Sequence, residues 1–212
     1  MNQKKPDEII LVHGLWMGPL AMSKLASRLS TLGYAVRRFN YPSTAHQLDE
    51  HARALGIFTL ESEASRVSFI SHSMGGLVTL RMLDLVGAPT VGRVALLGTP
   101  LSGSEIARRI SRVPGGHRLF GKARMPLVDG YTHVPDSTEV GMIAGTLPLG
   151  LGVLAGAARQ PGDGTVSIRE ANAPGLTDRI ELSVTHTSML YSARVTDQAV
   201  KFIETGHFDH SN

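Results

Sequence analysis

The sequence predicts an α/β protein: a three-layer α/β/α sandwich around a mostly parallel six-stranded sheet. Short apolar, β-branched runs alternate along the chain with longer segments of helical periodicity, the pattern of parallel strands joined by crossover helices. The length of 212 residues, with no internal repeat or Ser/Pro-rich linker, predicts a single domain over residues 1–212. Apolar residues make up 42% of the chain and charged residues 18%, a composition that folds around a core.

Six runs predict the strands. The first, Glu8-Ile-Ile-Leu-Val12, is apolar after its first residue and is followed by His13-Gly14, as expected of a strand buried on both faces. The later runs have similar character and end in turn residues, such as Gly98-Thr-Pro100 after the fourth. In chain order, the predicted strands are residues 8–12, 34–40, 66–71, 91–97, 139–144 and 179–184.

Four segments between these runs, and one after the last, predict helices. The apolar positions of the first recur at helical spacing and comprise Leu20, Leu25, Leu29 and Leu32. Gly33 then supplies a C-terminal cap. The second helix has a weaker stripe of Leu48, Ala52, Leu55 and Leu60, and the last a clear stripe of Val195, Ala199, Phe202 and Ile203. The predicted helices are residues 19–32, 46–61, 74–86, 103–112 and 194–205.

Two stretches fit neither period well. Residues 111–137 contain four glycines and three prolines, and they could form part of a cover over a site or a solvated excursion. Residues 142–158 carry no charge but are too short to cross a membrane. We expect a strand and then a Gly-rich loop there. For the second half of the stretch, a role as an apolar wall or flap beside a binding pocket stays open. Residues 111–160 are therefore the expected pocket-covering region.

The composition limits the available chemistry. The absence of cysteine excludes a disulfide scaffold, an iron–sulfur cluster, a cysteine-based zinc site and a cysteine nucleophile. No cluster of carboxylates indicates a metal site. The net charge is +3 and no run of Lys and Arg exceeds two residues, so nothing indicates a nucleic-acid partner. Any chemistry has to come from Ser, His and carboxylate side chains.

The stretch Ser71-His-Ser-Met-Gly-Gly76 lies between a predicted strand and a predicted helix. A sharp turn there would hold Ser73 in a strained conformation with its hydroxyl exposed, the geometry of a nucleophile elbow. The positions two before and two after the nucleophile must be small because strand and helix nearly collide, and Ser71 and Gly75 meet this requirement. The alternative is a plain turn with a serine N-cap, which the flanking strand and helix make the weaker interpretation.

Two backbone amides could stabilise an oxyanion beside Ser73. Met74 begins the following helix, whose free N–H groups point toward Ser73. The second donor would come from the loop after the first strand, where Gly14 allows close approach and Leu15 is the candidate. We expect His13 to brace this loop rather than to act in catalysis.

A general base is needed because a serine hydroxyl is a weak nucleophile at its free pKa. His186 lies just past the last predicted strand, where a loop can hold it over the carboxyl edge of the sheet. The remaining histidines lie on an exposed helix, beside Ser73, in the irregular stretch or near the end of the chain, and are His46, His51, His72, His117, His133, His207 and His210. We expect His72 to point away from Ser73, while His117 and His133 stay open as substrate contacts.

The acid is expected in Gly162-Asp-Gly-Thr-Val166, between the fifth strand and His186. Asp163 would accept a hydrogen bond from the ring of His186, fix its tautomer and stabilise the imidazolium. Asp-Gly is also an ordinary turn dipeptide, and Asp178 is the competing candidate, although it lies at the other end of the sixth strand. The resulting chain order is Ser73, Asp163, His186.

Together, His13-Gly14, Ser71 to Gly76, Gly98-Thr-Pro100, Asp163-Gly-x-Val166 and His186 resemble the α/β-hydrolase superfamily, in particular its small bacterial lipase- and esterase-like members. The resemblance covers nearly the whole chain. It implies a minimal α/β-hydrolase fold with a Ser73–His186–Asp163 triad, oxyanion donors at Leu15 and Met74, and no cofactor. Ser71 departs from the customary glycine, and strands that usually precede the first one are missing.

The expected activity is hydrolysis of carboxylic (acyl) esters, of esterase or lipase type, through an acyl-enzyme intermediate. The substrate would be a small or lipid-like acyl ester. Candidate pocket residues flank the catalytic elements and are Trp16, Met17, Leu147 and Leu149, with Leu151 and Val153 beyond them. An acyltransferase or thioesterase on the same triad, or a non-catalytic binding protein of the same fold, remain as alternatives.

The polar N-terminus shows no signal peptide and no transmembrane segment is predicted, so we expect a cytoplasmic protein. The sequence does not indicate an oligomeric state.

Overall fold

Six parallel strands form one sheet in the computed structural model, which describes residues 7–86, 91–150 and 160–211. The strands are β1 (Glu8–Val12), β2 (Ala35–Phe39), β3 (Val67–His72), β4 (Val91–Leu97), β5 (Val140–Gly145) and β6 (Asp178–Leu182). Their order across the sheet is β2-β1-β3-β4-β5-β6, and every neighbouring pair is parallel. The predicted fold class is confirmed, and each predicted strand end lies within two residues of the observed one.

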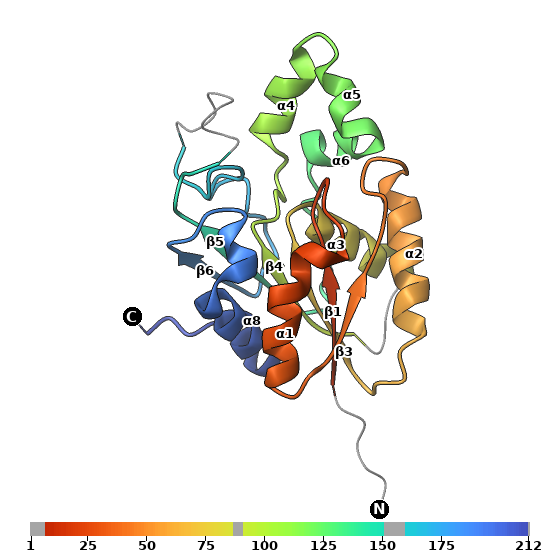
Figure 1. Ribbon diagram of the computed structural model, residues 1–212, viewed down its shortest axis with the longest axis vertical. Helices are drawn as coiled ribbons and strands as arrows, with labels where there is room; N and C mark the ends of the chain where they lie inside the picture. The colour runs from red at the N-terminus through yellow and green to blue at the C-terminus, as the bar shows by residue number, and fades with distance from the viewer. Residues whose placement is uncertain (1–6, 87–90, 151–159, 212) are drawn as a thin grey trace, which may run out of the picture.

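Helices cover both faces of the sheet and make the three layers (Figure 1). The helices of the two faces are α1 (Ser23–Thr31), α2 (Leu48–Leu60), α3 (Met74–Val86) and α8 (Ala193–Thr205). Helices α1 and α8 pack on one face, and α2 and α3 pack on the other. The short helices between β4 and β5 are α4 (Glu105–Arg112), α5 (Gly116–Phe120), η2 (Gly121–Ala123) and α6 (Arg124–Asp129). One-turn helices η1 (Pro19–Met22) and η3 (Ser188–Tyr191) precede α1 and α8.

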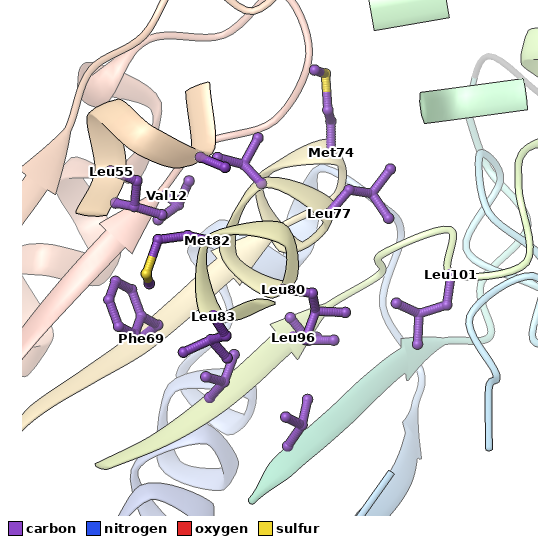
Figure 2. Close-up of a cluster of buried hydrophobic side chains, with 14 of the residues drawn as sticks. Val12, Leu55, Phe69, Met74, Leu77, Leu80, Met82, Leu83, Leu96 and Leu101 are labelled. Carbon is purple, nitrogen blue, oxygen red and sulfur yellow. The ribbon is translucent and has the colours of Figure 1, made fainter. Parts of the chain in front are cut away.

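The central strands are buried on both sides, as their continuous apolar runs predict. In β1, Ile10 and Val12 face the α2–α3 side, whereas Ile9 and Leu11 face the α1–α8 side. Figure 2 shows the first of these cores, in which apolar side chains of α3 such as Leu80 lie over the strands. Helix α3 follows β3 directly, so this packing fixes the position of the residue between them.

Two predicted helical stripes are partly wrong. Leu25 and Leu29 are buried as expected, but Leu20 is 80% exposed and Leu32, beyond the end of α1, is also exposed. The predicted helix begins with the 3₁₀ turn η1, whose three residues per turn shift the buried face so that Met22 points inward instead. In α2, Leu60 at the last position is exposed.

Histidine 51 was expected on an exposed helix face, and this prediction is wrong. It lies on the buried side of α2, with its ring edge-on to Tyr41 at a centroid distance of 4.7 Å. Burial is the main reason why the pKa of His51 lies below its usual value. His46 is exposed, as expected, but it precedes the helix rather than belonging to it.

The irregular stretch at residues 111–137 contains more regular structure than its sequence suggested. Helices α5, η2 and α6 are each only one or two turns long, too short to show a period. Gly115 precedes α5, Gly121 begins η2 and Gly130 follows α6, with positive φ of 78°, 53° and 78° that glycine adopts readily. The expected Gly-rich loop after β5 falls largely on residues 151–159, which lie outside the described residues.

Because all six strands are parallel, their carboxyl ends meet at one edge of the sheet. The loops that follow β1, β3, β4, β5 and β6 therefore converge there, and they carry the candidate residues. Within the described ranges, none of the helices has the length and apolarity needed to cross a bilayer.

Candidate active site

Ser73 occupies the single residue between β3 and α3. Its φ is 54°, a left-handed conformation that costs a non-glycine residue about 1–3 kcal/mol. Hydrogen bonds on both sides hold it there: the Ser73 N–H donates to the Leu97 carbonyl at 2.9 Å, and the Gly76 N–H donates to the Ser73 carbonyl at 3.0 Å. The predicted strand–turn–helix elbow is thus present.

The small residues around Ser73 are required by backbone contacts. A Cβ at Gly75 would lie 2.5 Å from the Val12 carbonyl oxygen and 2.6 Å from that of His13. Helix α3 therefore begins directly against the end of β1, and only glycine fits at this position.

Ser71 stands where glycine is customary, and the structure shows what accommodates it. The Thr79 hydroxyl donates to the Gly75 carbonyl at 3.0 Å, so the Ser71 hydroxyl donates to Thr79 Oγ1 at 2.7 Å. Both side chains are fully buried. Ser71 thus has a partner on α3 where its polar group would otherwise be buried without one.

His186 and Asp163 meet Ser73 in one line of hydrogen bonds. The Ser73 Oγ lies 3.0 Å from His186 Nε2, and His186 Nδ1 lies 2.7 Å from Asp163 Oδ2. Asp163 is 1% exposed, and its other oxygen accepts the N–H groups of Thr165 at 2.8 Å and Val166 at 2.7 Å. A carboxylate that only accepts places the proton of the imidazole on Nδ1 and leaves Nε2 free to accept the serine proton.

The loops that carry His186 and Asp163 are also joined through the backbone. The His186 N–H donates to the Asp163 carbonyl at 2.9 Å, and the Asp163 N–H donates to the Val166 carbonyl at 3.1 Å. The two loops follow β5 and β6, which are neighbours in the sheet. These bonds hold Asp163 and His186 in a fixed relative position.

His72 takes a position that sequence reasoning did not predict. Its ring was expected to point away from Ser73, and in the described residues its hydrogen bond is to His186 rather than to Ser73. The two histidine rings lie 4.6 Å apart, centroid to centroid. His72 Nε2 is 2.9 Å from the His186 carbonyl, which can only accept, so Nε2 carries the proton. Burial, followed by the neighbouring His186, lowers the pKa of His72 to about 3. His72 is therefore neutral, and it supports the loop of His186 by donating a hydrogen bond to the His186 carbonyl.

The loop after β1 lies against the serine. A Cβ at Gly14 would be 3.0 Å from the Cβ of Ser73 and 3.1 Å from His72 Nδ1. His13 braces the loop through a hydrogen bond from Nδ1 to the Gly14 carbonyl at 2.9 Å, and its ring stacks on Tyr41 at 4.5 Å. Burial keeps the pKa of His13 below its usual value.

The two candidate oxyanion donors flank Ser73. Leu15 follows Gly14 in this loop, and Met74 is the first residue of α3. In the described part of the chain, neither backbone N–H donates to a protein acceptor. At the start of a helix, such a free N–H lies in the positive field of the helix dipole.

A largely apolar cavity of about 560 Å³ opens beside Ser73 and His186. Of the predicted pocket residues, Trp16, Met17 and Leu149 line it, and Leu147 does not. Leu151 and Val153 lie outside the described residues. One wall comes from α4, α5 and α6 and consists of Ile106, Ala107, Ile110, Phe120 and Leu127. Phe120 and Leu127 fall within the expected cover, whereas the contribution of α4 was not foreseen. The expected cover at 111–160 therefore begins earlier in the chain.

The competing residues lie elsewhere. Asp178, at the first residue of β6, accepts the Phe208 N–H at 2.7 Å and lies 3.0 Å from His210 Nε2, at the opposite edge of the sheet from Ser73. His117 and His133 are exposed and do not line the cavity. Within the described residues, no group of three or more His, Asp or Glu side chains could hold a metal ion.

Comparison with known proteins gives consistent results. The chain resembles the mature lipase BlEst2 of Bacillus licheniformis, with a TM-score of 0.77 and 22% identity over 96% of this chain and 92% of that one. It resembles the phospholipase PlaB of Legionella pneumophila, with a TM-score of 0.63 and 17% identity over 78% of this chain and 45% of that one. A polyneuridine aldehyde esterase mutant matches with a TM-score of 0.63 and 11% identity over 92% of this chain and 98% of that one.

At these identities the structural likenesses show the fold. No curated protein matches the chain in sequence. The model of the alpha/beta hydrolase family, by contrast, matches residues 9–211. This match spans β1 to the end of α8 and includes every residue of the candidate site. The chain therefore belongs to the alpha/beta hydrolase family.

Proposed function

We propose that this protein hydrolyses carboxylic esters through an acyl-enzyme, with Ser73 as nucleophile, His186 as general base and Asp163 as the orienting acid. The observation that carries the proposal is the continuous line from Ser73 through His186 to Asp163, with contacts of 3.0 and 2.7 Å, beside an apolar cavity. Membership of a hydrolase family and the likeness to proteins titled lipase, phospholipase and esterase support it.

In the first step, the Ser73 oxygen attacks the ester carbonyl while His186 Nε2 takes the serine proton. The negative charge that develops on the carbonyl oxygen is stabilised by the N–H groups of Leu15 and Met74. Asp163 stabilises the imidazolium without itself being protonated. The bond to the alcohol then breaks, and His186 returns the proton to the leaving oxygen.

In the second step, His186 removes a proton from a water molecule, which attacks the carbonyl of the acyl-enzyme. The bond from the acyl carbon to Ser73 Oγ then breaks, His186 returns the proton to this oxygen, and the carboxylic acid leaves. The two-sided support of His186 matters for both steps. Asp163 holds its Nδ1 side, while His72 holds its backbone carbonyl at 2.9 Å. The imidazole can thus alternate between accepting and donating a proton without leaving its position.

The apolar lining of the cavity suits an aliphatic or aromatic acyl or alcohol group. Ile106 and Ile110 of α4 and Phe120 of α5 line the cavity and would contact this group. Trp16, which stacks on Phe120, and Met17 line it as well. We therefore propose an uncharged acyl ester as substrate.

Labelling with a fluorophosphonate probe tests the proposal directly. We expect the folded wild type to be labelled at Ser73 and to release p-nitrophenol from a short p-nitrophenyl ester. Ser73→Ala should lose both properties, whereas Ser27→Ala, which removes an exposed hydroxyl on α1, should keep both. A folded wild type that takes no label at Ser73 would contradict the proposal and favour a non-catalytic binding protein. Ester formation with an added alcohol in place of hydrolysis would favour an acyltransferase.

A further inference from the structure

The positive charge of this protein is concentrated in one short segment. Residues 105–129, here called the basic segment, contain six Arg and Lys and two Asp and Glu, a net charge of +4 against +3 for the whole chain. The segment consists of α4, α5, η2 and α6. The rest of the molecule is thus close to neutral, and the net positive charge lies in these helices.

Figure 1 shows the segment at the upper end of the molecule, with α4 and α5 projecting beyond the carboxyl edge of the sheet. Glu105 pairs with Arg108 at 3.2 Å and with Arg109 at 2.9 Å, and these arginines hold the pKa of Glu105 below its usual value. Arg112, Arg118 and Lys122 are exposed, and no carboxylate in the described part of the chain pairs with them. Their charges are therefore directed to the surroundings.

Large apolar side chains are exposed among these cations. Val113, between α4 and α5, is 59% exposed, and Leu119 of α5 is 58% exposed. Trp16 and Leu149, which are also exposed, line the cavity beside Ser73. Exposed apolar side chains thus occur both on the projecting end and at the cavity. Exposed apolar side chains gathered in this way mark an interaction surface.

The basic segment is joined to the wall of the cavity. The indole of Trp16 donates from Nε1 to the Leu119 carbonyl at 3.0 Å, and its ring stacks on Phe120 at 5.5 Å. On α4, Ile106 and Ile110 face the cavity, while Arg109 and Arg112 are exposed. The same short helices thus carry cations outward and an apolar wall inward.

We propose that the basic segment docks this protein onto an anionic lipid surface. Cations mixed with exposed apolar and aromatic side chains match such a surface, where headgroups meet the charges and the apolar groups enter the acyl boundary. A nucleic acid would match the charges but would leave Val113 and Leu119 without a partner. In the docked orientation, the apolar cavity next to the segment faces the lipid.

Vesicle binding tests this proposal without depending on catalysis. The protein carries Ser73→Ala, so that no hydrolysis alters the lipid, and it is sedimented with phosphatidylcholine vesicles with and without phosphatidylglycerol. We expect binding only to the anionic vesicles, weakened by added salt. Replacing Arg112→Glu together with Arg118→Glu should weaken it by roughly tenfold or more, since each cation near such a surface contributes measurably. Val113→Ser together with Leu119→Ser should also weaken it.

The matched control changes the net charge equally on a different part of the molecule. Lys24→Glu together with Lys201→Glu, on the exposed sides of α1 and α8, should leave vesicle binding unchanged. Equal losses in both charge-reversed proteins, or equal binding to neutral vesicles, would overturn the proposal. So would complete competition by a short DNA duplex, which would show a general polyanion site. If the arginine-to-glutamate pair does not fold, the corresponding glutamine pair carries the same test with a smaller expected loss.

Discussion

Gly75 is the residue at which the geometry of the elbow can be tested most sharply. Replacing it with alanine adds one methyl group at the start of α3 without removing any charge or hydrogen bond. The added Cβ would lie 2.5 Å from the Val12 carbonyl oxygen, 2.9 Å from the Val12 carbonyl carbon and 2.6 Å from the His13 oxygen. All three are backbone atoms at the end of β1, so no side chain can rotate away and the strand or the helix has to move.

The expected loss of stability follows from two opposing effects. Forcing an extra methyl group into a packed site costs about 1–3 kcal/mol, and rigid backbone neighbours place Gly75 in the upper half of that range. Alanine is favoured over glycine in a helix by about 1 kcal/mol, which offsets part of the cost. We therefore expect Gly75→Ala to lower the free energy of unfolding by about 1–2 kcal/mol.

Activity should fall further than stability. The end of β1 leads directly into Gly14 and Leu15, so a displacement there moves the proposed oxyanion donor away from Ser73. Loss of one such donor lowers kcat by about 10²–10³. A partial displacement should have a smaller effect than full loss of the donor, and we expect kcat to fall by roughly tenfold or more. The measurement is made at temperatures where the variant is folded.

Gly18→Ala is the matched control. No atom lies within 4 Å of the position of its Cβ, and its φ of −139° is open to any residue. This substitution should change stability by less than about 0.5 kcal/mol and leave kcat unchanged. Urea denaturation gives the free energy of unfolding, and hydrolysis of a p-nitrophenyl ester gives kcat. If Gly75→Ala is as stable and as active as Gly18→Ala, the close contact between α3 and β1 is not what shapes this site.

Three further changes test the surroundings of Ser73. Asp163→Asn should lower kcat for p-nitrophenyl ester hydrolysis by about 10⁴ with the fold intact, because an amide favours the wrong tautomer of His186. Asp178→Asn should leave kcat unchanged, and the reverse result would make Asp178 the acid. The depressed pKa of His72, about 3, means that the unfolded chain binds a proton below about pH 6.5 and the folded one does not. The free energy of unfolding should therefore fall as the pH is lowered from about 6.5 to about 3, on the order of 1 kcal/mol per pH unit. Urea denaturation at pH 7 and pH 5 should show a smaller loss of stability for His72→Gln than for the wild type. An equal loss in both proteins would mean that His72 is not the group responsible. Thr79→Val should lower the free energy of unfolding by about 1–3 kcal/mol, because it leaves the Ser71 hydroxyl buried without a partner. Adding Ser71→Ala should restore part of that stability in the same assay. No recovery would argue against a hydrogen bond between Ser71 and Thr79.

The strands and the order of catalytic candidates could be predicted because their signals are local. A buried parallel strand is a continuous apolar run, and the elbow needs small residues at fixed distances from Ser73. The same reasoning fails where neighbours in space are distant in sequence. His51 was expected to be exposed because α2 shows a weak stripe, but the ring of Tyr41 covers it. Leu20 was expected to be buried because nothing in the sequence shows that its helix begins with a 3₁₀ turn.

In the candidate site, too, residues with a local sequence signal could be predicted and residues that depend on distant neighbours could not. Ser73 precedes His186 by more than a hundred residues, yet each has its own local signature at the end of a strand. His72 has none, because its role depends on the backbone carbonyl of a loop that follows β6. The cavity wall from Ile106 to Leu127 was predicted only as a region, since the expected cover at 111–160 includes Phe120 and Leu127 but not Ile106. Its individual residues could not be named because helices of one or two turns show no measurable period, so their inward residues cannot be told from their outward ones.

The same short helices would serve both the proposed ester hydrolysis and the proposed docking onto a lipid surface. As an average, the pI of 9.4 carries no functional meaning, but placing the cations on the basic segment links it to the proposed docking. Within α4, Ile106 and Ile110 are four residues apart and share one face, whereas Arg109 and Arg112 are three apart and share another. Helical geometry alone thus separates the wall of the cavity from the charged surface. We expect substitutions at the arginines to weaken the proposed docking and leave the cavity unchanged. Substitutions at the isoleucines should change which groups the cavity accepts and leave the docking unchanged.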